Sequence, residues 1–319
     1  MPPKGIRGKS KLYSLAVSLS PGTTITDTRK QCFIIEKEFA QGGFGRIYSE
    51  YGKTGSLAIK VEPKGNGPLF TEITVFQRIL KQDLMKEYKE KHGVEHLGLP
   101  PHLGSGVFIY EGEELRFLAM PKYGCSFENY RVKCGGKVAL DVVIAVASQC
   151  ADCLAYMQEQ HMIFFALELI FKRTQDIKTA NILLANVKNF SKCYLVDFGL
   201  ARMIKSNVDK PDKKRAHNGT LMFTSTDAHR GCNPSPRGDL EILIYNILFW
   251  TTGSLPWQKL ENNAESVFAK KLEFLKDVEM NVKTFLKGDI ATCIINLLKI
   301  VHETPYTSKI DYVAVKKVS

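Results

Sequence analysis

The chain reads Asp176-Ile-Lys178-Thr-Ala-Asn181 and, a short interval later, Asp197-Phe-Gly199 after a short apolar run. Carboxylate and amide oxygens are the hard ligands that Mg²⁺ prefers. In order and spacing, the first run matches a loop that orients a substrate hydroxyl and neutralises the phosphoryl group during transfer. The second run matches a metal-binding loop. We therefore expect Asp176 and Lys178 to be catalytic, and Asn181 and Asp197 to hold a metal ion. Each carboxylate alone would be explained as well by a loop cap or a surface charge.

A glycine-containing turn and a lysine-bearing strand precede these runs. The turn lies between two apolar segments, which predicts strand, turn, strand. Its backbone N–H groups could bind phosphates, although a plain hairpin would use such glycines equally well. The residues of this predicted phosphate loop are Ala40, Gln41, Gly42, Gly43, Phe44, Gly45 and Ile47, with Ala40 in the first glycine position of GxGxxG.

The run Leu57-Ala58-Ile59-Lys60 matches the VAIK strand, whose lysine binds the α- and β-phosphates of a nucleotide. Glu72 lies near the start of the next predicted helix, where it can pair with Lys60 and fix it. We therefore expect Lys60 and Glu72 to be catalytic residues as well. A lone helical glutamate is usually a solvated charge, so the prediction for Glu72 depends on Lys60.

The composition is that of a globular protein. The 319 residues are 44% hydrophobic and 24% charged, and the formal net charge of +11 favours anionic partners. Cys150 and Cys153 form a close pair in a predicted helix, and we interpret them as buried, reduced thiols rather than half of a zinc site. The most apolar run, 162–171, contains Glu168 and is too short to span a bilayer, so we expect no membrane span.

The pattern of strands and helices predicts two lobes of an α+β fold. We expect a flexible basic tail over residues 1–28 and one domain over 29–319, with a first lobe over 29–120 and a second over 121–319. Segments with strand patterning are 33–39, 46–48, 56–61, 107–110 and 115–120, and segments with helical patterning are 70–91, 138–157, 240–252 and 289–301. The first lobe is thus a five-stranded antiparallel sheet with one helix, and the second is mainly helical.

Four further segments, 61–72, 219–229, 234–243 and 253–257, resemble the vaccinia-related kinases of the casein kinase 1 group. The resemblance runs from about residue 25 to residue 318. It implies a bilobal protein-kinase fold, in which the predicted helix after Lys60 is helix C and includes 85–88. It also implies a Ser/Thr protein kinase that uses ATP and Mg²⁺. Nucleotide-binding residues implied beside the phosphate loop are Ala58, Lys60, Met120 as gatekeeper, Pro121, Lys122 and Tyr123 as hinge, and Leu183.

The same resemblance implies partners and a location. Typical substrates of this family are histones and other chromatin proteins, and the location is the nucleus or the cytoplasm. Asp239, in the first turn of a predicted helix, would brace the catalytic loop, and an ordinary helix cap is the alternative. We expect a monomer without direct sequence-specific binding to nucleic acid.

The chain departs from the family just before Asp176. Thr174 stands where the family has a histidine, and about ten additional residues, within 164–175, precede the loop. Three explanations are open. The insertion is genuine and leaves Asp176 in place; it displaces the loop and leaves a pseudokinase or scaffold without turnover; or it is retained intron sequence in the assembled transcript.

Gln175 predicts how the chain is regulated. Many kinases carry an arginine there that binds a phosphate of the activation segment, and glutamine has no charge to do so. We expect ATP-dependent activity to persist after phosphatase treatment, because phosphates on Ser206, Thr220 or Thr224 would find no arginine at this position. A phosphoryl-transfer assay before and after treatment measures this, and complete loss of activity would contradict it.

Overall fold

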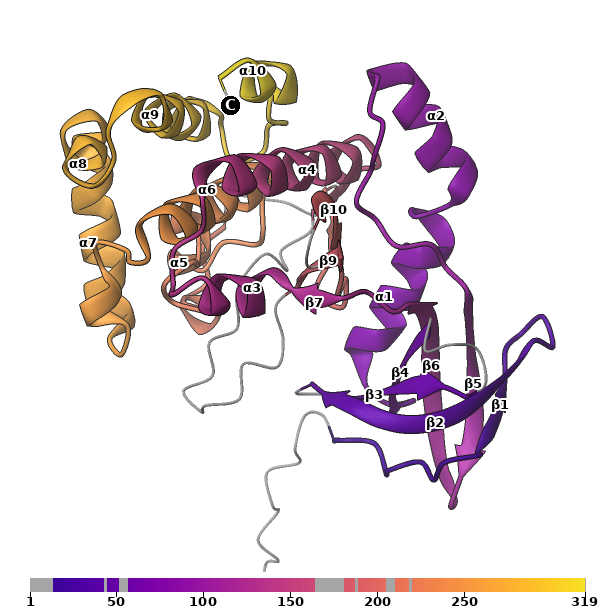
Figure 1. The fold of residues 1–319 in the computed structure, drawn as a ribbon. Helices are drawn as coiled ribbons and strands as arrows, with labels where there is room; N and C mark the ends of the chain where they lie inside the picture. The colour runs from indigo at the N-terminus through magenta and orange to yellow at the C-terminus, as the bar shows by residue number, and fades with distance from the viewer. Residues whose placement is uncertain are drawn as a thin grey trace, which may run out of the picture. The chain divides into compact units, whose positions relative to one another are not determined.

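The computed structural model describes residues 14–42, 45–51, 57–163, 181–186, 189–204, 210–217 and 220–318, with side chains at 189–191 excluded. The chain divides into two compact units. Unit 1 comprises Met1–Ile73 and His102–Lys122, and unit 2 comprises Thr74–Pro101 and Tyr123–Ser319. Unit 1 is built on a sheet, and unit 2 is mainly helical (Figure 1).

Unit 1 contains a six-stranded sheet in the order β1-β2-β3-β4-β6-β5, and every neighbouring pair is antiparallel. The strands are β1 (Thr24–Thr26), β2 (Cys32–Gln41), β3 (Arg46–Glu50), β4 (Leu57–Pro63), β5 (Gly104–Tyr110) and β6 (Glu113–Pro121). One face carries a core that includes Phe33, Ile35, Tyr48, Ile59 and Phe117, all fully buried. The five expected strands are present, and β1 adds a sixth at the edge because Ile25 is buried against this core.

The expectation of a flexible tail does not hold for residues 14–28. Ala16, Leu19 and Ile25 are buried in the core of unit 1, and the backbone N–H of Leu19 donates to the Tyr48 hydroxyl at 3.0 Å. These apolar residues are isolated among polar neighbours, so their sequence has no periodicity that would predict burial. The rest of the expected tail, residues 1–13, lies outside the described residues.

The segment 70–91 forms two helices instead of one. The helix α1 (Gly67–Arg78) closes where the N–H groups of Ile79 and Leu80 both donate to the Val75 carbonyl, and α2 (Gln82–His92) follows Lys81, whose backbone is extended. The family's longer helix C region, 85–88, therefore lies on α2. Residues 74–101 group with unit 2 because they pack on α4 (Leu140–Glu159), where the Tyr156 hydroxyl donates to the Ile79 carbonyl.

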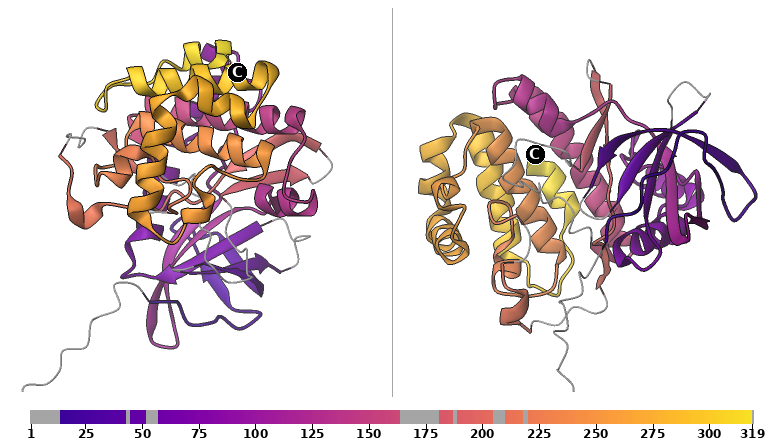
Figure 2. Two further views of the ribbon diagram at one scale, coloured as in Figure 1. Left: turned by 90° about the vertical axis from the view of Figure 1, so that its left-hand side faces the viewer. Right: turned by 90° about the horizontal axis from the view of Figure 1, so that it is seen from below.

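Unit 2 gathers its helices around α4 and α6 (Pro236–Thr252), and α9 (Gly288–Glu303) contacts α6, α8 (Val278–Phe285) and α10 (Tyr312–Val318) (Figure 2). The remaining helices are α3 (Phe127–Lys133), α5 (Thr226–His229), α7 (Ala264–Lys276) and the short 3₁₀ turns Lys213–Arg215 and Gln258–Leu260. Two small sheets accompany them: β10 (Asn189–Leu195), β9 (Ile182–Asn186) and β7 (Cys125–Ser126), and the pair β11 (Arg202–Met203) and β8 (Met162–Ile163).

The helix α4 is the core helix of this unit. Cys150 and Cys153 are buried on it, as the sequence predicts. A hydrogen bond with Cys193, together with burial, raises the pKa of the Cys150 thiol, and burial raises the pKa of the Cys153 thiol. Among the described residues, α4 alone is long and apolar enough to cross a membrane by length and composition, but 56% of its most apolar stretch is buried. Its packing against α6 and β10 accounts for its apolar character.

The helix α6 begins at Pro236, before the first residue of its apolar pattern, Leu240. The Ser235 hydroxyl accepts from the N–H of Gly238, and Pro236 occupies the first turn, where its missing N–H costs nothing. These residues extend the helix before the apolar periodicity begins at Leu240.

We expect Leu19→Ala to destabilise the protein by about 2–5 kcal/mol, because it removes a buried side chain from the core of unit 1. Leu15→Ala is the matched control. Leu15 is 37% exposed, so its loss changes the free energy of unfolding by about 0.5 kcal/mol or less. Urea denaturation of both variants measures the difference, and equal stabilities would contradict the packing of residues 14–28.

Candidate functional site

The predicted phosphate loop joins β2 to β3. Ala40 pairs with Ile47 and Gln41 with Arg46, and the N–H of Gly42 donates to the Gly45 carbonyl at 2.8 Å. Ala40 thus lies in extended backbone within a strand, where a methyl group is tolerated. The alanine in the first glycine position therefore imposes no backbone strain. Gly43 and Phe44, the tip of the loop, lie outside the described residues.

Gly45 is required by packing. A Cβ at this position would lie 2.5 Å from the Val61 carbonyl oxygen and 2.5 Å from Cγ of Glu62. Because the carbonyl belongs to the backbone of β4, it cannot move aside as a flexible side chain would. The missing side chain lets β3 and the loop lie directly on β4.

Lys60 and Glu72 form the ion pair that the sequence predicts. Nζ of Lys60 lies 2.7 Å from Oε2 of Glu72, and the side chains are 16% and 1% exposed. Lys60 projects from β4 and Glu72 from the first half of α1. An ion pair this well shielded from water is screened little by salt, so Glu72 fixes the position of the ammonium group.

A second carboxylate, which sequence reasoning missed, also faces Lys60. Oε1 of Glu62 lies 3.7 Å from Nζ of Lys60, and Oε2 accepts from the backbone N–H of Leu69 at 3.2 Å. Glu62 follows Lys60 by two positions on β4, so both side chains lie on one face of the strand. Side chains two positions apart on a strand lie on the same face, and this spacing could have identified Glu62 from the sequence.

The implied gatekeeper and hinge begin at the end of β6. Met120 pairs with Ala58 on β4 and is buried, and Pro121 pairs with Leu57. Nζ of Lys122 lies 4.3 Å above the Phe39 ring. Lys122 is the last residue of unit 1, and Tyr123 belongs to unit 2.

Tyr123 begins the second part of unit 2. Its ring stacks on Tyr194 with centroids 4.0 Å apart and an interplanar angle of 20°. Burial raises the pKa of the Tyr123 hydroxyl, so this group stays neutral at physiological pH. Leu183 on β9 pairs with Ser126 and with Tyr194, so the implied nucleotide contacts Tyr123 and Leu183 share one structural neighbour, Tyr194.

Asn181 and Asp197 are brought together through the backbone. The N–H of Val196, the residue before Asp197, donates to the Asn181 carbonyl at 2.9 Å, and Asn181 is buried. Asp197 has φ of 67°, a left-handed conformation that costs a non-glycine residue free energy. The fully buried Phe198 ring, edge-on to Phe76 at 5.7 Å, anchors the strained turn.

The two residues fit a magnesium ion better than a transition metal. Across the described part of the chain, no three His, Cys, Asp or Glu side chains gather in a way that could hold a metal. Mg²⁺ needs no such cluster, because it binds through one or two carboxylates together with substrate phosphates and water. Asp176 and Lys178, the predicted catalytic pair, lie outside the described residues.

The segment 220–229 is anchored to α6 by buried charges. Arg237 donates to both oxygens of Asp227, at 2.7 and 2.6 Å, and Ser235 donates to the same carboxylate. Glu241 accepts from Thr226 and from the Tyr245 hydroxyl, and burial raises the pKa of Glu241. None of these contacts was predicted from the sequence, because each charge alone looks like a helix cap. Asp239 is buried in the first turn of α6.

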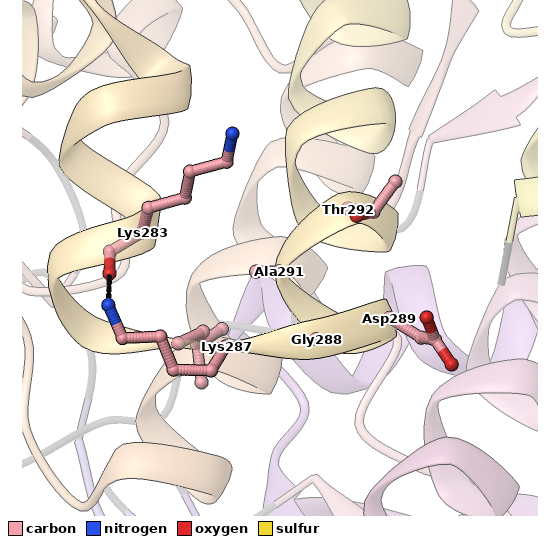
Figure 3. A pocket seen from close by; sticks show the side chains of 7 residues that line it. Lys283, Lys287, Gly288, Asp289, Ala291 and Thr292 are labelled. Carbon is pink, nitrogen blue, oxygen red and sulfur yellow. Dashed lines mark hydrogen bonds between the residues drawn. The ribbon is translucent and has the colours of Figure 1, made fainter.

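One hollow is lined by none of the predicted site residues that the structure describes. It has a volume of about 360 Å³ and lies at the turn between α8 and α9, where Nζ of Lys287 donates to the Lys283 carbonyl at 2.8 Å (Figure 3). Its lining residues are Lys283, Leu286, Lys287, Gly288, Asp289, Ala291 and Thr292. It does not belong to the predicted nucleotide site.

Comparison with known proteins gives consistent matches over nearly the whole chain. A family model described as fungal protein kinase matches residues 160–252. The chain is 45% identical over 322 residues to Serine/threonine-protein kinase VRK1 of Caenorhabditis elegans, covering 99% of this chain and 51% of that protein. It is 36% identical to Nucleosomal histone kinase 1 of Drosophila melanogaster, over 96% of this chain and 50% of that protein. The chain thus spans about half the length of these relatives.

A viral relative is matched over almost its whole length. Probable serine/threonine-protein kinase FPV212 of fowlpox virus is 32% identical, over 95% of this chain and 97% of that protein. A solved structure described as vaccinia related kinase 3 superposes with a TM-score of 0.77 and 24% identity, over 95% of this chain and 90% of that one. That structural likeness confirms the expected kinase fold.

We expect Gly45→Ala to destabilise the protein by about 1–3 kcal/mol, because the methyl group meets the backbone of β4. Gly65→Ala is the control, since a Cβ at Gly65 has nothing within 4 Å. Thermal unfolding measures both, and Gly65→Ala should shift the free energy of unfolding by about 0.5 kcal/mol or less. Equal midpoints for the two variants would contradict the close contact at Gly45.

Proposed function

We propose, from the premise that this chain belongs to the vaccinia-related kinase family, that it transfers the γ-phosphoryl group of ATP to serine and threonine hydroxyls of proteins. The observation that carries the proposal is the shielded ion pair between Lys60 and Glu72, 2.7 Å long. An ammonium group fixed in this way beside a glycine-containing hairpin is suited to binding nucleotide phosphates.

Unit 1 would bind the nucleotide. Lys60 would hold the α- and β-phosphates, and the backbone N–H groups of the β2–β3 turn would contact the same phosphates. Ala58 and Met120, paired across β4 and β6, would contact the adenine ring, and Pro121 to Tyr123 would offer backbone groups to its edge.

Unit 2 would supply the metal ligands and the catalytic loop. Asp197 and Asn181 would hold Mg²⁺, which when bound offsets negative charge on the β- and γ-phosphates. Asp176 would orient the substrate hydroxyl and accept its proton, and Lys178 would offset charge on the transferring group. The backbone hydrogen bond between Val196 and Asn181 supports the metal role, because it holds the backbone at Asn181 beside the residue that precedes Asp197 before a ligand arrives.

Chromatin proteins are the substrate class that we propose. The relative from Drosophila melanogaster is named a nucleosomal histone kinase, and a nuclear or cytoplasmic location is consistent with it. The net charge of +11 would attract the acidic surfaces of such assemblies. We propose that the chain acts as a monomer and recognises proteins rather than nucleic acid sequence.

The alternative function is a scaffold that binds nucleotide or partners without turnover. The residues before Asp176 favour it, because Thr174 and Gln175 replace the family's histidine and the common arginine, within about ten additional residues. A displacement of Asp176 by about 1 Å could reduce the rate about a hundredfold.

Transfer of radiolabelled phosphate from ATP to histone and casein tests the proposal. We expect the unaltered chain to label substrate, and Lys60→Met and Asp197→Asn to lose about a hundredfold or more of the rate, since each removes a charge that stabilises the transferring group. Lys64→Met is the matched control, because Lys64 pairs with Glu114 on the exposed surface of unit 1.

A further variant separates the two functions. Deletion of residues 164–173 restores the spacing of the family, so activity that appears only in this variant would show that the insertion blocks catalysis. Labelling that stays at background in every protein, while an ATP analogue still binds, would support the scaffold instead.

A further inference from the structure

Residues 14–20 lie against the sheet of unit 1 without forming a strand, and we call this segment the strap (Figure 1). Ala16 and Leu19 anchor it, because both are buried in the core of the unit. Five side chains of unit 1 also bind its backbone. Two donate to carbonyls and three accept from N–H groups: Asn66 binds Ser14, Arg46 binds Ala16, Glu113 binds Val17, Tyr48 binds Leu19, and Tyr110 binds Ser20.

Arg46 joins the strap to the hairpin that carries the predicted phosphate loop. Its Nε donates to the Ala16 carbonyl at 2.8 Å, and its Nη1 donates to both carboxylate oxygens of Glu38 on β2, at 3.1 and 2.9 Å. Arg46 directly follows Gly45 and pairs with Gln41 across the hairpin. Because the guanidinium is planar and its donors have a fixed geometry, one rigid group holds the strap, β2 and β3 together.

Asn66 joins the strap to the start of α1. The residue is 4% exposed, and its Nδ2 donates to the Ser14 carbonyl at 2.8 Å, which gives the buried amide the partner it needs. Its backbone N–H donates to the Pro63 carbonyl at 2.9 Å, and its carbonyl accepts from Nη1 of Arg116 at 3.3 Å. The helix α1 begins at the next residue and carries Glu72. These contacts therefore fix the point from which that helix starts.

The remaining contacts hold the strap on the core independently of Arg46 and Asn66. The hydroxyls of Tyr48 and Tyr110 accept from backbone N–H groups of the strap at 3.0 and 3.2 Å, and Leu19 is 4% exposed. A variant that loses Arg46 or Asn66 therefore keeps the strap in place. It loses only the attachment of the strap to the phosphate-loop hairpin or to α1.

We propose that Arg46 and Asn66 are positioning residues for nucleotide binding, and that they act together through the strap. The carbonyls that they bind belong to Ala16 and Ser14, two positions apart on one short segment. A shift of the phosphate-loop hairpin relative to α1 therefore stretches one of these two hydrogen bonds.

This link matters because the proposed nucleotide site has one part on each side of it. The hairpin of β2 and β3 lies on the side of Arg46, and Glu72, which orients Lys60, lies on the side of Asn66. The phosphates would contact both parts, so an error in their relative position weakens binding. The inference deepens the proposed function, and it rests on that function for the binding of nucleotide but not for the transfer of phosphate.

Binding of N-methylanthraniloyl-ATP, a fluorescent ATP analogue, with Mg²⁺ tests the inference. We expect Arg46→Met and Asn66→Ala each to raise the Kd about three- to tenfold, the effect of roughly one lost hydrogen bond. Arg29→Met is the matched control, because Arg29 also donates to a backbone carbonyl, that of Leu103, and pairs with Asp27. Arg29 lies between β1 and β2, so the Kd of this variant should stay within about twofold of that of the unaltered chain.

The double variant, with Arg46→Met and Asn66→Ala combined, distinguishes one shared link from two separate effects. If both residues act through the strap, the loss of either breaks the link. The double variant then binds the analogue about as weakly as the weaker single variant. Separate effects would multiply, and the Kd would rise about ten- to a hundredfold.

Steady-state kinetics gives a readout that a loss of stability alone does not change. A fraction of unfolded protein lowers the apparent kcat and leaves the KM as it was, whereas a displaced phosphate site raises the KM for ATP. We expect the KM for ATP to rise in both single variants and to stay constant in Arg29→Met. If Asn66→Ala fails to fold, the comparison of Arg46→Met with Arg29→Met still decides the question.

Three outcomes would overturn the inference: a Kd that is unchanged in Arg46→Met, a Kd of the double variant that equals the product of the two separate effects, or an unaltered chain that binds no analogue. If the variants bind the analogue as expected while no protein accepts phosphate, the strap stands and the proposed phosphoryl transfer fails. If the unaltered chain labels histone and every variant binds the analogue equally well, the proposed function stands and the strap fails.

Discussion

The ammonium group of Lys60 lies near two buried carboxylates in unit 1, those of Glu62 and Glu72, and the arrangement of β4 and α1 depends on these contacts. Burying a charge is costly unless it is paired and hydrogen-bonded, so Glu62 and Glu72 both require partners. Lys60 lies 2.7 Å from Glu72 but 3.7 Å from Glu62. The N–H of Leu69, in the first turn of α1, donates to Glu62, and the positive end of the helix dipole lies there. The helix start thus stabilises Glu62 and leaves Lys60 oriented by Glu72. The same three charges fix the beginning of α1 against the strand that carries the lysine.

Unit 2 holds Asp197, the proposed metal ligand, by a different means. The left-handed backbone of Asp197 costs about 1–3 kcal/mol, so the surrounding packing must outweigh that cost. The neighbours on each side provide it: Val196 donates to the Asn181 carbonyl, and Phe198 is fully buried with its edge against Phe76. The strain is therefore confined to Asp197, the residue that we propose as a metal ligand.

The sequence predicts the parts of the fold that depend on local spacing. The strand, turn, strand of the phosphate loop and the pair of Lys60 and Glu72 follow from motifs whose spacing reflects their function. The burial of Leu19 could not be predicted, because a single leucine among polar residues has no period. Nor could the break after α1, since Ile79 and Leu80 continue the helical pattern, and the Ile79 carbonyl instead accepts from the Tyr156 hydroxyl on α4. Such features are decided by tertiary packing, which no local pattern encodes.

Two adjacent lysines on α7 show the same limit in unit 2. Lys270 and Lys271 are alike in the sequence, yet Lys270 is 40% exposed and pairs with Glu273, whereas Lys271 is fully buried. A buried lysine needs acceptors, and helices and sheets already use most of their carbonyls in their own hydrogen bonds. The irregular backbone at 221–224 has carbonyls to offer, so it accepts from Lys271. These hydrogen bonds satisfy the buried ammonium group of Lys271. They also fix the backbone of 221–224, which has no regular helix or sheet hydrogen bonds to hold it.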